Sequence, residues 1–395
     1  MLFISPLKAT IDLGDIKAEI TQLTQQLHQV NGNFIRGGVP KIIIKEQRGD
    51  GAAYNPVLHT LTLDLEVYNI CQTFGDQSKD ALAFIIGHEM AHCYMEHPFF
   101  SKFNSYHKCE GSTYSNEQKA DVYGLFNAYL AGYNSFTILP EVIATIYKEY
   151  GLSDQLSGYP SKQDRMNTAI QSQKEIKNLI GIYESANYLS AIGKYRLAAD
   201  SYEYILRFYQ GREIYNNIAV NSALEGLNFT EKDYDLYLYP LEIDWNTRIK
   251  KPKKDRGGED LTTNEMAYRM TCLSLAKENF EMAGRLDQSY FTSDINKIVV
   301  LTLMKRYKEA VDYYEQLEKS KKILVHGINE IQKESALLAV ANAKAHLPAF
   351  NNEAREIFNA LSMSENAQIA YQATNNLREL EEGPCGAAEF ISCKE

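Results

Sequence analysis

Residues 87–97 read GHEMAHCYMEH and contain the pattern H-E-x-x-H at His88, Glu89 and His92. On a helix, His88 and His92 are four residues apart, so they project from one face and can share one metal ion. Glu89 lies beside them, where a carboxylate can take a proton from an attacking water. The pattern therefore predicts a metal site with a general base next to it.

The residues around this pattern predict a buried helix. Ser78 fits the N-cap, and we expect the helix to run to His97 because Pro98 follows. Its apolar residues occupy nearly every side rather than one face, which indicates burial. Two imidazoles and a carboxylate in an apolar interior are costly without a metal or other partners, so a metal site is favoured over two isolated histidines. These ligand types suit zinc best, and we expect one ion per chain.

A catalytic zinc site needs a third protein ligand and an open position. His97 projects from another side of the helix that carries His88 and His92, and His107 is a weaker candidate. The run N-E-Q-K-A-D, from Asn116 to Asp121, offers the better ligand, because Glu117 falls in the first turn of the next helix. Asp121 lies four residues later on the same face, where it can accept the free N–H of a ligand histidine, and Asn116 is placed with it in this outer layer.

Several further elements precede and follow this pair of helices. We expect a helix over residues 14–30, strands at 41–45 and 58–64, and a turn region between the strands. Ser115 and Gln118 form a capping box for a helix ending at Gly132, and Pro140 fits the start of another that ends near Gly151. Few strands and several helices predict an α+β domain over residues 1–175.

A helical repeat occupies residues 180–395, interrupted by an insertion at about 227–262. Four stretches each place a small residue four positions before an aromatic residue on one helical face. This spacing resembles the second helix of tetratricopeptide (TPR) repeats. The stretches contain Gly193, Tyr195, Ala198 and Tyr202; Ala276, Phe280 and Ala283; Tyr307, Ala310, Tyr314 and Leu317; and Ala354, Phe358 and Leu361.

The bulk composition excludes some partners. The 395 residues carry a formal net charge of -10, which argues against nucleic acid, and the basic run Lys250–Arg256 is read as a solvated loop. No stretch approaches twenty apolar residues, so we expect no integral membrane segment. Cys93 and Cys109 flank the candidate site but lack a Cys-x-x-Cys zinc pattern. Cys385 and Cys393 could pair in an oxidising compartment, but free thiols are favoured for the six cysteines. As written, the chain looks cytoplasmic, and it would be periplasmic if an N-terminal signal is missing.

The residues of the metal site carry a resemblance to a known family. HEMAH followed by Glu117 and Asp121 resembles the gluzincin metallopeptidases, above all the group of the CAAX prenyl endopeptidases, HtpX and BepA. That group carries E-x-x-A-D, a small residue, and then a small-H-P…R segment. The corresponding residues here are Ala120, Gly124, Pro160 and Arg165. Two departures are Tyr159, which stands where the family has histidine, and a shorter gap between His92 and Glu117.

The resemblance implies a fold and a mechanism. It implies an α+β zincin-type metallopeptidase domain followed by an all-α TPR-like repeat domain, as BepA-like members have. It implies zinc bound by His88, His92 and Glu117, with Glu89 as general base. Tyr159 and Arg165 are the candidates for stabilising the oxyanion of the transition state. The strand carrying Leu58, Thr60 and Thr62 would be an edge strand that pairs with extended substrate.

Two classes of function stay open at this point. The first is a zinc metalloendopeptidase that cleaves unfolded or misassembled proteins, with repeats that recruit or gate the protein or peptide substrate. The second is a TPR chaperone or scaffold, with a protein partner on the repeat surface and a latched or idle zinc site. Glu89 favours the first, because a structural site has no need of a general base.

Overall fold

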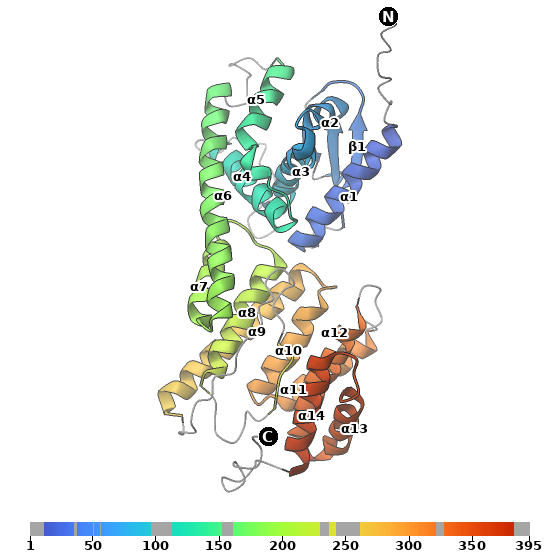
Figure 1. The fold of residues 1–395 in the computed structure, drawn as a ribbon, viewed down its shortest axis with the longest axis vertical. Coiled ribbons are helices and arrows are strands. Elements are labelled where there is room, and N and C mark those ends of the chain that lie inside the picture. Colours follow the sequence, from blue (N-terminus) through green and yellow to red (C-terminus); the bar gives the residue numbers. More distant parts are fainter. Residues whose placement is uncertain are drawn as a thin grey trace, which may run out of the picture. The chain divides into compact units, whose positions relative to one another are not determined.

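The computed structural model describes residues 12–34, 38–49, 51–55, 57–95, 113–151, 161–229, 237–241, 261–320 and 328–382. The chain divides into two compact units, Met1–Gly181 and Ile182–Glu395, and each is described by itself (Figure 1). Among the described residues, no helix has the length and apolar character needed to cross a membrane. Several predicted features lie outside the described residues, namely His97, His107, Tyr159, Pro160, Lys250–Arg256, Cys109, Cys385 and Cys393.

The first unit contains a small three-stranded sheet with strands β1 (Lys41–Lys45), β2 (Ala52–Asn55) and β3 (Thr60–Asp64). The strand order is β1–β3–β2, with β3 parallel to β1 and antiparallel to β2. Strands β1 and β3 were predicted. Strand β2 was not, because its four residues lie among turn-forming glycine, asparagine and proline and are too few to show alternation.

The prediction that Leu58, Thr60 and Thr62 form an edge strand is wrong. Strand β3 lies between β1 and β2 and has partners on both sides, so it has no open edge for a substrate. Leu58 precedes the strand, in the turn after β2, and is 67% exposed. Among the described strands, β2 is the edge strand that contacts the helix of the H-E-x-x-H pattern.

Among the described residues, six α-helices belong wholly or mainly to the first unit. They are α1 (Leu13–Asn31), α2 (Leu65–Gln72), α3 (Ser78–Met95), α4 (Thr113–Leu130), α5 (Leu139–Glu149) and α6 (Lys162–Ala191), with short 3-10 turns at Gly75–Gln77 and Ser135–Thr137. Helix α3 is buried on nearly every side, as its sequence predicted. Helix α4 begins at Thr113, so Ser115 lies within the helix and is not its N-cap. The predicted capping box is therefore wrong, because the helix begins three residues earlier than a cap at Ser115 would allow.

The second unit is built of helices α7 (Tyr195–Ile205), α8 (Arg212–Leu227), α9 (Thr263–Leu286), α10 (Phe291–Leu303), α11 (Tyr307–Lys319), α12 (Glu330–Ala345), α13 (Asn351–Leu361) and α14 (Ala367–Glu382). Helices that follow one another in sequence pack together from α7 to α14, and α12 also contacts α10 and α14. Alternate helices therefore stack along one layer, an arrangement that paired helical repeats produce.

The repeated small and aromatic positions form the core of this unit. Ala198, Ala276, Ala310 and Ala354 are fully buried, and the aromatic residue four positions after each, from Tyr202 to Phe358, is at most 7% exposed. A small residue one turn before a large one lets neighbouring helices approach while the ring fills the space between them. The sequence pattern thus located the core, while the assignment to TPR repeats stays a prediction.

Candidate metal centre

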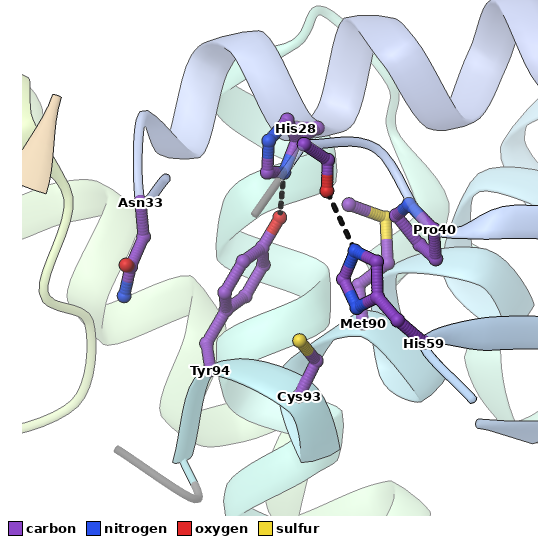
Figure 2. Close-up of a pocket in the computed structure, with 8 residues that line it drawn as sticks. His28, Asn33, Pro40, His59, Met90, Cys93 and Tyr94 are labelled. Atoms are coloured by element: carbon purple, nitrogen blue, oxygen red, sulfur yellow. Dashed lines mark hydrogen bonds between the residues drawn. The ribbon is translucent and has the colours of Figure 1, made fainter. Parts of the chain in front are cut away.

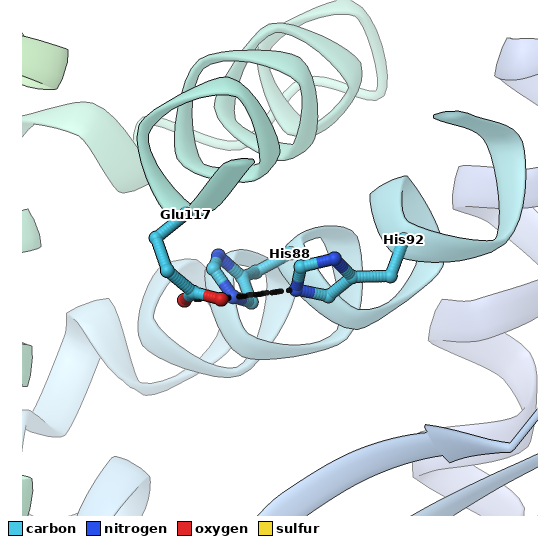
Figure 3. Close-up of side chains that lie close together, drawn as sticks. All are labelled: His88, His92 and Glu117. Atoms are coloured by element: carbon cyan, nitrogen blue, oxygen red, sulfur yellow. Dashed lines mark hydrogen bonds and ion pairs between the residues drawn. The ribbon is translucent and has the colours of Figure 1, made fainter. Parts of the chain in front are cut away.

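Three side chains from helices α3 and α4 converge on one point. The Nε2 atoms of His88 and His92 lie 3.3 Å apart, and the Glu117 carboxylate lies 3.3 Å from His88 Nε2 and 3.7 Å from His92 Nε2 (Figure 3). They are the group of histidine, cysteine and acidic side chains, within the described part of the chain, whose ligand atoms could hold one ion. The predicted ligand set is therefore brought together in space.

These distances fit a tetrahedral zinc ion. Zinc binds nitrogen or oxygen at about 2.0–2.2 Å, so two ligand atoms on one tetrahedral ion lie roughly 3.3–3.5 Å apart. The atoms that face one another in this cluster are carboxylate oxygens of Glu117 and the Nε2 atoms of the two histidine rings. Since His88 Nδ1 is used by Asp121, a neutral His88 presents the lone pair of Nε2 to a carboxylate. Such an arrangement requires a cation, either a proton or a metal ion.

Asp121 fixes the ring of His88 from behind. Its Oδ1 lies 2.9 Å from His88 Nδ1, and the side chain is fully buried. A carboxylate is only an acceptor when ionised, so Nδ1 carries the hydrogen and Nε2 is left to face Glu117. A contact of this kind would orient and strengthen a histidine ligand. The structure thus brings Asp121 to His88, while its role behind a metal ligand stays a prediction.

Arg165 on α6 binds Asp121 rather than facing an incoming substrate with its terminal nitrogens. Both of these nitrogens donate to Asp121 at 2.7 Å, and Ser172 adds a longer hydrogen bond of 3.3 Å. The expectation that Arg165 stabilises an oxyanion is corrected accordingly: its guanidinium is committed to a buried carboxylate. Because an unpaired buried carboxylate is costly, Arg165 is what allows Asp121 to stay ionised inside the unit.

The backbones of α3 and α4 touch beside the ligands. A β-carbon on Gly87 would come within 2.8 Å of Gly124 O, and a β-carbon on Gly124 within 2.5 Å of the carbonyl carbon of Gly87. Only glycine permits this approach at both positions. The contact sets the separation between the helix that carries the two histidines and the helix that carries Glu117 and Asp121.

Burial and neighbouring charges shift the pKa values of the ligand side chains strongly. Burial lowers the pKa of His88, but Asp121 and Glu117 outweigh it and raise that pKa to about 10. Burial and the charge on His88 lower the pKa of His92 to about 4. Burial raises the pKa of Glu117, yet its bond to His88 brings the value down to about 2. In the absence of metal, one proton therefore holds the cluster together, and it sits on His88.

Glu89 is held by the edge strand of the sheet. The backbone N–H of Tyr54 on β2 donates to Glu89 Oε2 at 3.0 Å. Burial raises the pKa of Glu89, and this hydrogen bond partly counters the rise by stabilising the ionised form. The carboxylate is thus kept beside the ligands with a pKa above its ordinary range, as a general base requires.

The hydrogen-bond pattern of β2 shows which of its main-chain groups face β3 and which face Glu89. Asp64 donates its N–H to Gly51 O at 2.7 Å, so Gly51 and every second residue after it direct their backbone groups toward β3. Tyr54 and Ala52 are the intervening residues, whose backbone groups point away from β3, and the N–H of Tyr54 is directed toward Glu89. Sequence reasoning missed Tyr54, since its contribution is a main-chain amide and carries no side-chain signal.

Buried hydrogen bonds fasten α1 to the two ligand helices. His28 Nδ1 lies 2.8 Å from the hydroxyl of Tyr94, two residues past His92. Both residues line a small pocket (Figure 2). The Tyr123 hydroxyl, on α4, accepts a hydrogen bond from Asn31 Nδ2 at 2.7 Å. These contacts hold α3 and α4 against the same neighbour, so the ligands are presented by a rigid frame.

The remaining predicted site residues have the following places. Asn116 lies in the first turn of α4, and its side chain, like Tyr159, lies outside the described residues. Cys71, Cys93 and Cys272 are buried cysteines in the thiol form, in agreement with the prediction for these three. Comparison of the chain with family models, with curated proteins and with solved structures finds no match.

Proposed function

We propose that this protein is a zinc-dependent endopeptidase. One observation carries the proposal: His88 Nε2, His92 Nε2 and Glu117 converge at zinc-ligand spacing while Glu89 stands beside them on the next position of the same helix. A structural zinc site closes all four positions with protein ligands and has no use for a free carboxylate. Three ligands plus an adjacent buried carboxylate favour hydrolysis instead.

Each residue has a distinct role in the proposed reaction. His88, His92 and Glu117 would hold the ion, and Asp121 with Arg165 would keep His88 oriented. A bound zinc ion lowers the pKa of water and polarises a carbonyl group. Glu89 takes the proton of the attacking water and returns it to the leaving amine, for which its raised pKa is suited.

The substrate class follows from the edge strand. On the side of β2 that faces Glu89, the main-chain groups of Ala52 point away from β3, in the direction from which an extended chain would pair with this edge strand. Pairing through the main chain gives affinity with little sequence preference. This favours protein substrates with exposed extended segments, as in unfolded or misassembled chains, over a single fixed target.

The test is cleavage of a diverse peptide library by the zinc-loaded protein beside a Glu89→Gln variant. The variant keeps the three ligands, so equilibrium dialysis should still find one zinc ion per chain. We expect cleavage by the first protein and a loss of at least about 100-fold in the second. Zinc binding by both without cleavage by either would reject the peptidase and leave the repeat unit as the functional part. Equal cleavage by both would remove Glu89 from the reaction.

A further inference from the structure

A short extended segment of the insertion lies against the second unit and is held by its main chain. Leu238, the second residue of the segment Tyr237–Leu241, donates its N–H to Asn376 Oδ1 at 2.8 Å. The carbonyl of Leu238 accepts from Asn376 Nδ2 and from Asn342 Nδ2, each at 2.9 Å. Gln372 adds a longer bond of 3.4 Å to the carbonyl of Tyr239. No side chain of Leu238 is needed for any of these bonds.

The two asparagines form one preorganised unit. Asn342 belongs to α12 and Asn376 to α14, and Asn376 Nδ2 donates to Asn342 Oδ1 at 2.8 Å. A carboxamide offers a donor and an acceptor side by side, so Asn376 can bind the N–H and the C=O of a single residue as a neighbouring strand would. Both side chains are fully buried beneath the segment. Without an extended chain on top of them, they would lose the partners that a buried amide needs.

Side-chain contacts on either side of Leu238 give the site its preference. The ring of Tyr237 packs edge-on to His346 and stacks on Phe358, with centroids 5.1 and 6.3 Å apart. Tyr239 and Leu241 pack against the main core of the unit, and Pro240 is buried. The pattern is an aromatic residue, any residue, a second aromatic, proline and leucine. Main-chain bonds with pockets for flanking side chains are the elements of extended-peptide recognition.

The occupant comes from far along the chain. Leu238 is separated from Asn342 by 104 residues and from Asn376 by 138. The segment has neither helix nor strand pairing of its own, and main-chain groups of Leu238 and Tyr239 bond to asparagine and glutamine side chains. It therefore sits on α12 and α14 in the manner of a bound peptide rather than as part of the helical framework.

We propose that Asn342 and Asn376 form a binding site for extended protein segments, and that residues 237–241 fill it in cis as a built-in competitor. The partner is an extended chain with two aromatic residues spaced two apart and followed by proline and leucine. It displaces the internal segment and takes over its hydrogen bonds to the two asparagines. A tethered segment competes at an effective concentration on the order of millimolar, so the partner binds weakly until the internal segment is removed. The inference is independent of the metal centre.

The test uses a fluorescein-labelled peptide with the sequence of residues 235–243, DLYLYPLEI, and the full-length protein. A Leu238→Pro variant removes the N–H that Asn376 accepts in the internal segment and leaves the site itself intact. We expect this variant to bind the peptide at least tenfold more tightly than the unaltered protein does in fluorescence anisotropy. Adding Asn376→Ala to it should reverse the gain. A peptide N-methylated at its central leucine is the matched control and should bind neither protein.

Two results would overturn the proposal: equal affinity of the peptide for the unaltered protein and the Leu238→Pro variant, or affinity that Asn376→Ala leaves unchanged. A second measurement needs no substitution and decides the matter if a variant fails to fold. Amide hydrogen exchange at Leu238 of the unaltered protein should accelerate severalfold at saturating peptide and not with the N-methylated control. Exchange that stays constant while the peptide binds would place the peptide elsewhere and reject the site.

Discussion

Gly124 on α4 lies in backbone contact with Gly87 on α3, immediately before His88. A β-carbon on Gly124 would come within 2.6 Å of the main-chain nitrogen of His88. Helix α4 also carries Glu117 and Asp121, about two turns and one turn before the contact respectively. The position of both carboxylates relative to the histidines therefore depends on two residues that have no side chain.

A Gly124→Ala substitution should push α4 away from α3. We expect a loss of about 1–3 kcal/mol in the free energy of unfolding, because the clash is with backbone that cannot rotate aside. Zinc affinity should fall with it, since Glu117 moves away from the two histidines. Thermal unfolding and zinc competition with a chelating dye measure the two effects.

The matched control for this change is Gly181→Ala, where an added β-carbon meets no atom within 4 Å. There the substitution should stabilise by up to about 1 kcal/mol, because alanine favours the helix. If Gly124→Ala behaved like the control, the contact between the two helices would not set the geometry of the centre.

An Arg165→Met substitution should leave Asp121 as a buried carboxylate without its main counter-charge. We expect a cost of about 3–5 kcal/mol in the free energy of unfolding. Zinc affinity should drop about 10–100-fold as the His88 ring loses its fixed orientation. Denaturant unfolding and the same chelator competition measure both. Arg378→Met, on an exposed side chain of the second unit, should change neither. Unaltered zinc binding by Arg165→Met would mean that Asp121 orients His88 without help.

Zinc binding should release one proton per ion at neutral pH. His88 holds a proton below its raised pKa of about 10, whereas His92 and Glu117, with pKa values of about 4 and 2, have already lost theirs. The ion must displace that single proton, so affinity should rise about tenfold per pH unit across the neutral range. Calorimetry in buffers of different ionisation enthalpy gives the count directly. A count of zero or two would contradict the charge state assigned to the cluster.

A Tyr54→Pro substitution should raise the pKa of Glu89. It removes the amide that stabilises the ionised carboxylate, while the β2–β3 ladder keeps its bonds because the N–H of Tyr54 points away from β3. The acid limb of kcat/KM for peptide cleavage should then move to higher pH. Tyr54→Ala keeps the amide and serves as the control for the lost ring. A limb that stays in place in both variants would assign it to another group.

A Phe280→Ala substitution should destabilise the second unit by about 3–5 kcal/mol, because the ring is 1% exposed in the middle of its core. Leu275→Ala, on the same helix but 42% exposed, should cost far less. Denaturant unfolding monitored by far-ultraviolet circular dichroism compares them. Similar costs for the two would contradict the repeated aromatic positions as the source of stability.

Part of the site could be predicted because its signals are local. His88 and His92 share a face at a spacing of four on any helix, and so do Glu117 and Asp121. The buried character of α3 followed from apolar residues on all its sides. In the second unit, the small and aromatic spacing identified core positions such as Ala354 and Phe358 before any contact was known.

Other parts could not be predicted because they depend on which segments meet. Strand β3 shows the alternation of a half-buried strand, but alternation cannot tell an edge strand from a central one. Arg165 and Asp121 are 44 residues apart, and nothing local states that they pair. Likewise, the asparagines at 342 and 376 are ordinary helix residues until an extended segment is seen lying on them.

The sequence by itself determined that His88, His92, Glu117 and Asp121 lie on helices and which of them share a helix face, since these follow from residue spacing along a regular backbone. The tertiary structure decided the rest: that Arg165 neutralises Asp121, that β2 holds Glu89 through an amide, and that Tyr237–Leu241 fills a site on α12 and α14. The physical reason is the same in each case. These contacts join segments that are distant in sequence, through main-chain groups or buried charges. Their free energy depends on how deeply the groups are buried and how closely the segments approach each other, which no local pattern encodes.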